Sequence, residues 1–390
     1  QSLNFAVAIY IDRIIYDSEK VDEETEFNLH ETYLQLNGRS WDISFGKQRV
    51  RWGKSDQLSP VDSINPQDYR QSVAVDLEER AMPSWLLRSR WYGHAFGLET
   101  ILQPWFKKSE TNYFDSDWAL YRNLRQSILA HPSVPALLKN YASTLYVDED
   151  KPSNTLENMS AGIRLTMQTD QTDVALSYHY GWETLPTISS FPVGGINYNG
   201  DTNTDVSTML ASITPFPPTT NRIEATYKRQ QTVGAEWETT LLDPFGFRGE
   251  IAYTDKVAFL NSALISTRKR VTHLVTGIDY TSESEWYFNI QGSLQYIHGF
   301  EKNILYFDKN TVALLGEISK PVLRGNVEFA TKYNYVVTDK SSYLQPSVTL
   351  KYFRNVECEF GAMVYNGEGE TLLGSYDQAD QIYGIVKITF

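Results

Sequence analysis

The feature of this chain that most constrains its fold is an alternation of apolar and polar residues that recurs along its length. The first example runs from Leu3 to Asp12, and the last runs from Ile382 to Phe390. Residues two apart share one face of a β-strand, so each stretch predicts a strand with one apolar face. The longest unbroken apolar run, Phe5–Ile11, is far shorter than the roughly 20 residues of a membrane-spanning helix. We therefore expect an all-β protein.

The alternating stretches give about 16 strands, and the connections between them are alternately short and long. Three connections are much longer than the others, at 54–84, 104–156 and 183–221. Short periplasmic turns at one end and long extracellular loops at the other are typical of up-and-down antiparallel barrels of the Gram-negative outer membrane. We therefore predict one transmembrane barrel over 1–390. Because the alternation starts at once, we take the chain as a mature or trimmed form.

Composition agrees with this prediction. Only every second residue of a barrel strand has to be apolar, which fits the negative mean hydropathy of the chain. The chain contains 25 Tyr, 18 Phe and 9 Trp, and such aromatic residues gather at the two membrane interfaces of outer-membrane barrels.

One stretch, 41–53, conflicts with its own alternation. Its odd-numbered residues first form an apolar row, Trp41, Ile43 and Phe45. They then form a basic row, Lys47, Arg49 and Arg51. A cation on the lipid-facing side costs about 2–4 kcal/mol near the membrane midplane. We therefore expect the strand to switch faces at Gly46, as a β-bulge allows, so that the basic row lines a polar interior.

The next strand adds two more cations, Arg88 and Arg90. Pairing the two strands through the loop 54–84 places Arg49 near Arg88 and Lys47 near Arg90. Like charges opposite each other are destabilising, so this basic wall needs anions. The alternative is that the arginines satisfy carboxylates of the lumen and plug the barrel.

The loop 104–156 supplies acidic partners, Asp115 and Asp117, and apolar residues at helical spacing that predict short helices. It is either an external lid or a segment, 115–145, that folds into the lumen as a constriction or plug. A basic wall opposite an acidic segment selects solutes by charge. This arrangement predicts passive diffusion of small solutes and ions with a modest anion preference.

Three segments resemble one family. They are FGKQRVRWGKSDQLSPVDSINPQDYR at 45–70, AGIRLTMQTDQTDVALSYHYGWETLP at 161–186 and TVGAEWETTLLDPFGFRGEIAY at 232–253. They are similar to a porin-like outer-membrane family of unknown function. The resemblance implies a β-barrel, often encoded beside RND-type transporters, and hence traffic of hydrophobic compounds. Pro-Trp-Phe stands at 104–106 where that family leads us to expect Pro-Glu-Phe. The terminal Phe390 resembles the assembly signal of outer-membrane barrels.

Several classes of function are disfavoured. The net charge of −13 argues against nucleic-acid binding. The lone Cys358 excludes an internal disulfide, and the six histidines lack zinc-binding spacing. We expect no enzyme activity, no metal and no cofactor.

Two alternatives to a diffusion channel remain. One is a loop-plugged barrel that takes up hydrophobic compounds, with a lateral exit and an entrance lined by aromatic residues: Trp105, Phe106, Trp118 and Tyr121. The other is a sleeve around a partner protein. The expected partners are outer-membrane lipid, lipopolysaccharide, the barrel assembly machinery, small solutes and further copies of the chain.

Overall fold

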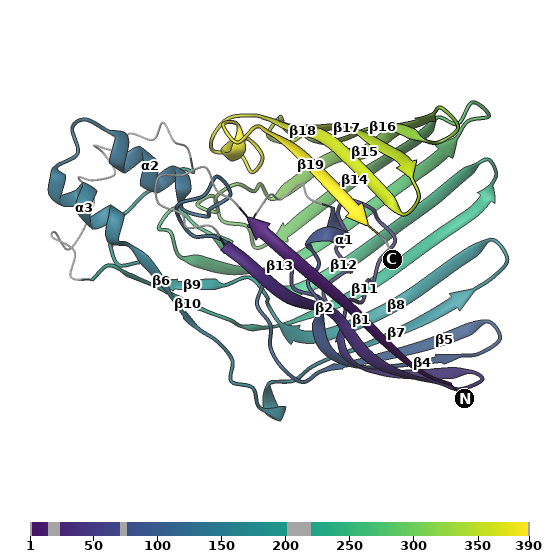
Figure 1. Cartoon of the computed structure of the whole chain (residues 1–390). Helices are drawn as coiled ribbons and strands as arrows, with labels where there is room; N and C mark the ends of the chain where they lie inside the picture. The colour runs from purple at the N-terminus through teal and green to yellow at the C-terminus, as the bar shows by residue number, and fades with distance from the viewer. Residues whose placement is uncertain (1, 15–23, 71–75, 201–219, 389–390) are drawn as a thin grey trace.

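A single antiparallel sheet of 16 strands dominates the computed structural model, which describes residues 2–14, 24–70, 76–200 and 220–388. Each strand pairs with its neighbours in chain order, and the sheet curves into a barrel (Figure 1). The predicted fold class and strand number are confirmed. The strands are β1 (Ser2–Ile14), β2 (Glu24–Asn37), β3 (Trp41–Gln48), β4 (Ser84–Tyr92), β5 (Phe96–Gln103), β7 (Ser160–Gln168), β8 (Thr172–Trp182), β11 (Arg229–Leu242), β12 (Phe245–Leu260), β13 (Ser266–Thr281), β14 (Tyr287–His298), β15 (Asn310–Val322), β16 (Val327–Val336), β17 (Ser341–Phe353), β18 (Val356–Asn366) and β19 (Gln381–Ile388).

The two faces of the sheet differ as the alternation predicts. Large apolar side chains on the outward face stay exposed, for example Ile290 at 52% and Leu344 at 51%. Their neighbours Gln291 and Gln345 point inward and are buried at 0% and 6% exposure. The barrel therefore has an apolar outside and a polar inside. None of the helices in the described ranges is long and apolar enough to cross a membrane.

One alternating stretch does not form a single continuous strand. The alternation over 222–241 suggests a single strand, but it divides into β10 (Arg222–Thr226) and β11. β10 leaves the barrel and joins a small sheet with β6 (Tyr146–Asp150) and β9 (Thr187–Ser190). Both sheets bury one face of the chain, so the alternation continues across the break and does not reveal it.

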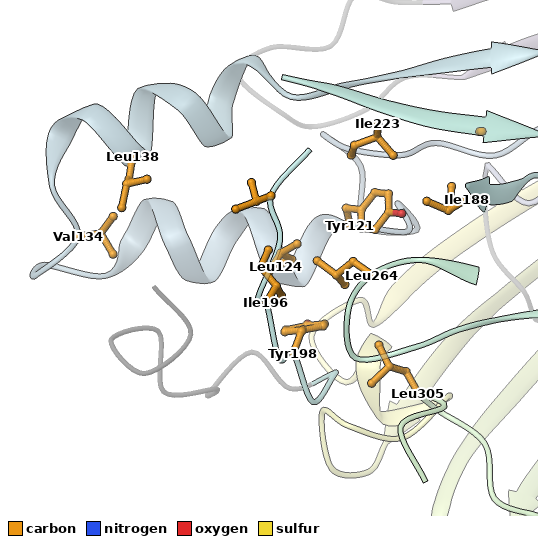
Figure 2. Close-up of a cluster of buried hydrophobic side chains, with 12 residues drawn as sticks. Tyr121, Leu124, Val134, Leu138, Ile188, Ile196, Tyr198, Ile223, Leu264 and Leu305 are labelled. Atoms are coloured by element: carbon orange, nitrogen blue, oxygen red, sulfur yellow. The ribbon is translucent and has the colours of Figure 1, made fainter. Parts of the chain in front are cut away.

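The long connections form a cap at one end of the barrel (left in Figure 1). It contains α2 (Arg122–Ala130), α3 (Ala136–Thr144) and the small sheet. Figure 2 shows its apolar core, which joins residues from several loops: Tyr121, Leu124, Val134, Leu138, Ile188, Ile196, Tyr198, Ile223, Leu264 and Leu305. The predicted helical insertion in 104–156 thus packs mainly against the other loops. Two 3-10 turns, Leu156–Asn158 and Gly374–Tyr376, complete the long connections.

Candidate functional site in the barrel lumen

The lumen is occupied by the connection between β3 and β4, here called the luminal segment (residues 49–83, described at 49–70 and 76–83). Its apolar residues are buried against inward-facing residues of the wall instead of forming an external loop. The cluster comprises Val50, Trp52, Val61 and Ile64 from the segment and Leu86, Ile101 and Ala252 from the strands. Trp52 is 1% exposed and lies against Gly162 of β7, where a Cβ would come within 2.7 Å of the indole ring. The wall is therefore shaped to receive this side chain.

Glu250 of β12, a carboxylate of the barrel wall, anchors the segment. It is fully buried and accepts three hydrogen bonds, from the Ser55 amide (2.9 Å), the Ser59 hydroxyl (2.7 Å) and the Val61 amide (3.1 Å). A buried carboxylate is tolerated only when donors satisfy its oxygens. Gly53 allows this close approach, because its φ is +105° and a Cβ there would lie 2.8 Å from a Glu250 oxygen.

Beyond its contacts with Glu250, the segment bonds to Arg248 on the same strand and to strands that follow it in the sheet. The Asp56 carboxylate pairs with Arg248 (2.9 Å) and accepts hydrogen bonds from the amides of Asn289 (3.1 Å) and Gln291 (2.8 Å). The Gln57 side chain contacts β17, since its oxygen accepts a hydrogen bond from the Tyr343 hydroxyl at 3.2 Å. This part of the segment therefore bonds to β12, β14 and β17.

The last part of the segment contains a short helix, α1 (Leu77–Arg80), which contacts the final strands of the barrel. Asp76 pairs with Lys332 of β16 at 2.6 Å, and Glu79 pairs with Lys387 of β19. Figure 1 shows α1 in the interval between the first and last strands.

The same helix is tied to the first hairpin. Arg49 donates to the Glu78 carbonyl at 2.6 Å and pairs with Glu31 of β2 at 3.6 Å, while Arg51 pairs with Glu78 at 2.9 Å. Within the described ranges, no backbone pairing joins β1 to β19. The contacts Glu31–Arg49–Glu78 and Glu79–Lys387 therefore link β2 to β19 through α1.

The predicted switch of face at Gly46 does not occur. Both pairings of β3 pass through Gly46 without a shift of register, and Lys47 lies opposite Thr32 and Trp85 on the outward row. Gly46 is needed for another reason: its φ is +144°, and a Cβ there would come within 2.2 Å of the Thr32 carbonyl oxygen. Arg49 and Arg51 leave the outward face because the strand ends at Gln48.

Lys47 itself stays outside, near the end of β3 that faces the long loops. Its neighbours on that face form an aromatic cluster, with Phe45 and Trp105 at 5.6 Å and 5.3 Å from Trp85. A lysine at this level reaches the polar boundary of a membrane, where the cost of a cation falls to about 0–1 kcal/mol.

The other predicted cations face inward, but each has its own carboxylate. The predicted pairing of Arg49 with Arg88 is wrong, because Arg88 lies opposite Ser44 and Arg90 lies opposite Asp42. Arg88 pairs with Glu99 (2.7 Å) and Arg90 with Asp42 (3.0 Å). These two carboxylates were not predicted, although the odd–even alternation of β3 and β5 already places them inward.

The predicted acidic residues lie in the cap. Asp115 pairs with Arg125 and Asp117 with Arg122, at 2.9 Å and 3.0 Å. Both therefore bind arginines of their own loop instead of the basic residues of the strands. Phe390, the predicted assembly signal, lies outside the described residues.

The aromatic residues predicted at the entrance occupy separate places. Trp118 is 8% exposed and packs on Tyr365 of β18 at 5.4 Å, so its loop does reach the inner wall at the barrel mouth. Tyr121 belongs to the cap core, Phe106 packs on Tyr227, and Trp105 belongs to the outward cluster.

Burial changes the ionisation of two acids of the luminal segment. Burial raises the pKa of Asp62 to about 7, against a hydrogen bond from the Trp52 amide and the charge of Arg51. Glu250 and Glu236 raise it further because they are negative. Burial also raises the pKa of Asp56, and the Arg248 guanidinium opposes this shift. The segment thus holds a carboxyl that titrates near neutrality.

The role of the luminal segment was missed from the sequence. The signal was present: the loop carries large apolar residues, among them Val50, Trp52, Val61 and Ile64, between its polar ones. An external loop has no reason to carry them, whereas a segment packed inside a barrel does.

A family model described as "Protein of unknown function (DUF1302)" matches residues 12–325. The chain belongs to this family. The resemblance noted on 45–70, 161–186 and 232–253 is therefore confirmed at the level of a family of unknown function. No curated protein matches the chain.

Several solved structures of outer-membrane proteins are distantly similar. OccAB3 of Acinetobacter baumannii has a TM-score of 0.45 at 10% identity, over 95% of this chain and 78% of that one. OccD3 of Pseudomonas aeruginosa has a TM-score of 0.45 at 9% identity, over 100% and 82%. The outer membrane channel DcaP of Acinetobacter baumannii has a TM-score of 0.43 at 7% identity, over 100% and 82%. These likenesses are too distant to bear on function.

Proposed function

We propose that this protein is an outer-membrane channel for small solutes whose lumen is gated by the luminal segment. The outward apolar rows support the location, since such rows fit the hydrocarbon of a bilayer. Burying Ile290 or Leu344 in lipid removes apolar surface from water, at about 25 cal/mol per Å². Lipid, lipopolysaccharide and the barrel assembly machinery are the partners that this location requires.

The main support for the proposed gate is the contact between Glu250 and the luminal segment. Three donors of the segment converge on one buried carboxylate, and Trp52 fills the space beside Gly162. A chain held in this way blocks the axis of the barrel until these bonds break. The remaining wall is polar, with paired charges such as Arg88–Glu99, as expected for a surface that meets water after opening.

The paired charges also bear on selectivity. An anion preference needs cations that are not neutralised, yet Arg49, Arg51, Arg88 and Arg90 each bind a carboxylate. We therefore propose only weak charge selectivity in place of the anion preference expected from the basic row. Reversal potentials near zero across a tenfold salt gradient are expected.

Planar-bilayer recording tests the gate. The wild-type barrel should show low current with rare openings, and a variant with residues 54–62 replaced by a Gly-Ser linker should conduct steadily. Heat-modifiable migration on gels shows that the variant still forms a barrel. A large steady current through the wild type would refute the gate, and absence of current in both proteins would refute the channel.

Uptake of hydrophobic compounds is the second candidate, and the filled lumen favours it because a barrel for such compounds has no need of an open water path. An RND-type transporter would be the partner in this case. Copurification of such a transporter with the intact barrel would support it, and full conductance of the linker variant without any uptake defect in cells would count against it. The alternative that the barrel is a sleeve around a partner protein loses support, because the chain's own segment occupies the lumen.

A further inference from the structure

A group of basic and aromatic residues lies on the outer surface of the barrel, at the end that carries the cap. This cationic patch comprises four residues: Arg270 of β13, Tyr296 and His298 of β14, and Lys309, which directly precedes β15. The loops beside these residues contribute Leu264 and Leu305 to the core of the cap. The patch therefore belongs to the loop end of the barrel.

The strand register places the patch on the outward face. Leu294 of β14 is exposed at 40%, and Tyr296 and His298 follow it at every second position. Ile297, which lies between them, points inward and is 0% exposed. Arg270 lies directly opposite His298 on the neighbouring strand, and directly opposite residues share one face of a sheet. The patch thus continues the outward apolar row of the wall at its loop end.

Contacts within the patch hold its side chains in place. The Nε2 atom of His298 lies 2.9 Å from the hydroxyl oxygen of Thr272, which shares the outward row with Arg270. The His298 ring packs edge-on against Tyr296, with 4.6 Å between the ring centroids. The Lys309 ammonium lies 5.6 Å from the centroid of the same tyrosine ring, within the range of a cation–π contact. The patch is therefore a preformed surface built around Tyr296.

The two cations of the patch are not neutralised by the protein. Both are exposed, and within the described ranges neither Arg270 nor Lys309 forms an ion pair. Glu301, in the loop that follows β14, is already bound by Lys269. The inward arginines of β4, in contrast, each bind a carboxylate. The positive charge of the patch is therefore available to an anion from outside the chain.

The surroundings of the patch indicate what kind of anion fits. Exposed apolar side chains, Leu294 and Ile290, continue the same row of β14 toward the middle of the barrel. A ligand lying along this row is anionic at one end and apolar at the other. A guanidinium binds phosphate through two parallel hydrogen bonds, and a lysine ammonium adds a point charge. A lipid with a phosphorylated headgroup has both properties.

We propose that the cationic patch binds the phosphate groups of lipopolysaccharide, with the acyl chains of its lipid A along Leu294 and Ile290. The long connections of outer-membrane barrels face the cell exterior, so the leaflet at the cap end is the one that contains lipopolysaccharide. The proposal rests on the proposed outer-membrane location. It does not depend on the gate, because the patch and the luminal segment lie on opposite faces of the sheet.

Native mass spectrometry of the detergent-purified barrel, titrated with lipid A, tests the site. A basic residue near an anionic membrane surface strengthens binding about fivefold. The double variant Arg270→Gln with Lys309→Gln should therefore bind lipid A about 25-fold more weakly than the wild type. The variant Arg270→Lys with Lys309→Arg keeps both charges and should retain most of the affinity. Heat-modifiable migration on gels shows that each variant is folded.

The opposite end of the barrel supplies a matched control. There Lys320 lies 5.2 Å from the Trp286 ring, and Arg324 occupies the adjacent turn. Lys320→Gln with Arg324→Gln removes the same two charges and should leave lipid A binding unchanged. Equal affinities of the wild type and the Arg270→Gln, Lys309→Gln variant, or an equal loss in the control variant, would overturn the site.

Two further titrations identify the ligand. Lipid A without its phosphates, and phosphatidylglycerol, should each bind the wild type much more weakly than lipid A. Equal binding of the dephosphorylated form would refute recognition of phosphate, and equal binding of phosphatidylglycerol would replace lipopolysaccharide with anionic lipid in general. Planar-bilayer currents of the Arg270→Gln, Lys309→Gln variant should match the wild type. Absence of current in the wild type refutes the channel alone, so the two proposals can fail separately.

Discussion

Replacing Glu250 by Gln is the sharpest perturbation of the gate, because it keeps the size of the side chain and removes its charge. In the wild-type protein, one oxygen of the Glu250 carboxylate accepts a hydrogen bond from Ser55, and the other accepts hydrogen bonds from Ser59 and Val61. An amide keeps only one oxygen, so its NH₂ group must face a donor. The unsatisfied donor costs about 1–3 kcal/mol, and the surviving bonds lose their charge assistance.

We expect the Glu250→Gln substitution to weaken the anchoring of the luminal segment by about 3 kcal/mol. Since 1.4 kcal/mol is a factor of ten, the population of the open state should rise about 100-fold. Single-channel recording measures this directly, as the fraction of time spent at full conductance.

Glu359→Gln is the control for this experiment. Glu359 is also an inward carboxylate, but it accepts its hydrogen bond from Tyr383 on the neighbouring strand, at 2.7 Å. Its loss should leave the open fraction near the wild-type value. If Glu250→Gln behaves like Glu359→Gln while both barrels are folded, Glu250 does not hold the gate and the reasoning fails.

Three further predictions concern the wall, the pH response and the strand pairing. Arg88→Gln leaves the buried Glu99 without its 2.7 Å partner and should lower the free energy of unfolding by about 3 kcal/mol, whereas Arg88→Gln with Glu99→Gln should recover most of it in urea titrations. Because burial raises the pKa of Asp62 from 3.8 to about 7, the folded protein binds this proton more tightly, and closed-state stability falls as pH rises through that window. Openings should therefore become more frequent from pH 4 to pH 7 and level off above pH 7. Asp62→Asn should abolish this dependence; a persisting pH response would assign it to another group. Gly46→Ala should cost about 1–3 kcal/mol and impair assembly, because its φ of +144° suits only glycine, while Gly292→Ala on β14, with nothing within 4 Å of the added carbon, should assemble normally.

The barrel could be predicted from the sequence because its rule is local. Each strand shows its outward face by alternation, and Ile290 beside Gln291 is enough to say which side is which. The position of the loops follows from no such rule. Contacts such as Asp56 with Gln291 join residues 235 positions apart, and nothing in either stretch identifies its partner.

The predicted site failed for a related reason. The apolar and basic residues around Lys47 predict a change of face only if the strand continues to Arg51. The strand ends at Gln48 instead, and the chain turns into the lumen. Where a strand ends depends on what its next residues can pack against, and here that surface, which includes Ala252 of β12, is made much later in the chain.

The position of the luminal segment between the third and fourth strands of the sheet has a consequence for how the barrel is made. The segment leaves the ribosome before every wall strand except the first three, and its partners Glu250, Lys332 and Lys387 follow some 200 to 300 residues later. Its contacts with these residues can form only once the later strands are in place. Contacts this distant in sequence form slowly, so docking of the segment should be a late step in folding. A barrel that closes before the segment has docked would be a stable but empty tube, and the fraction of such tubes should depend on how fast the last strands are added.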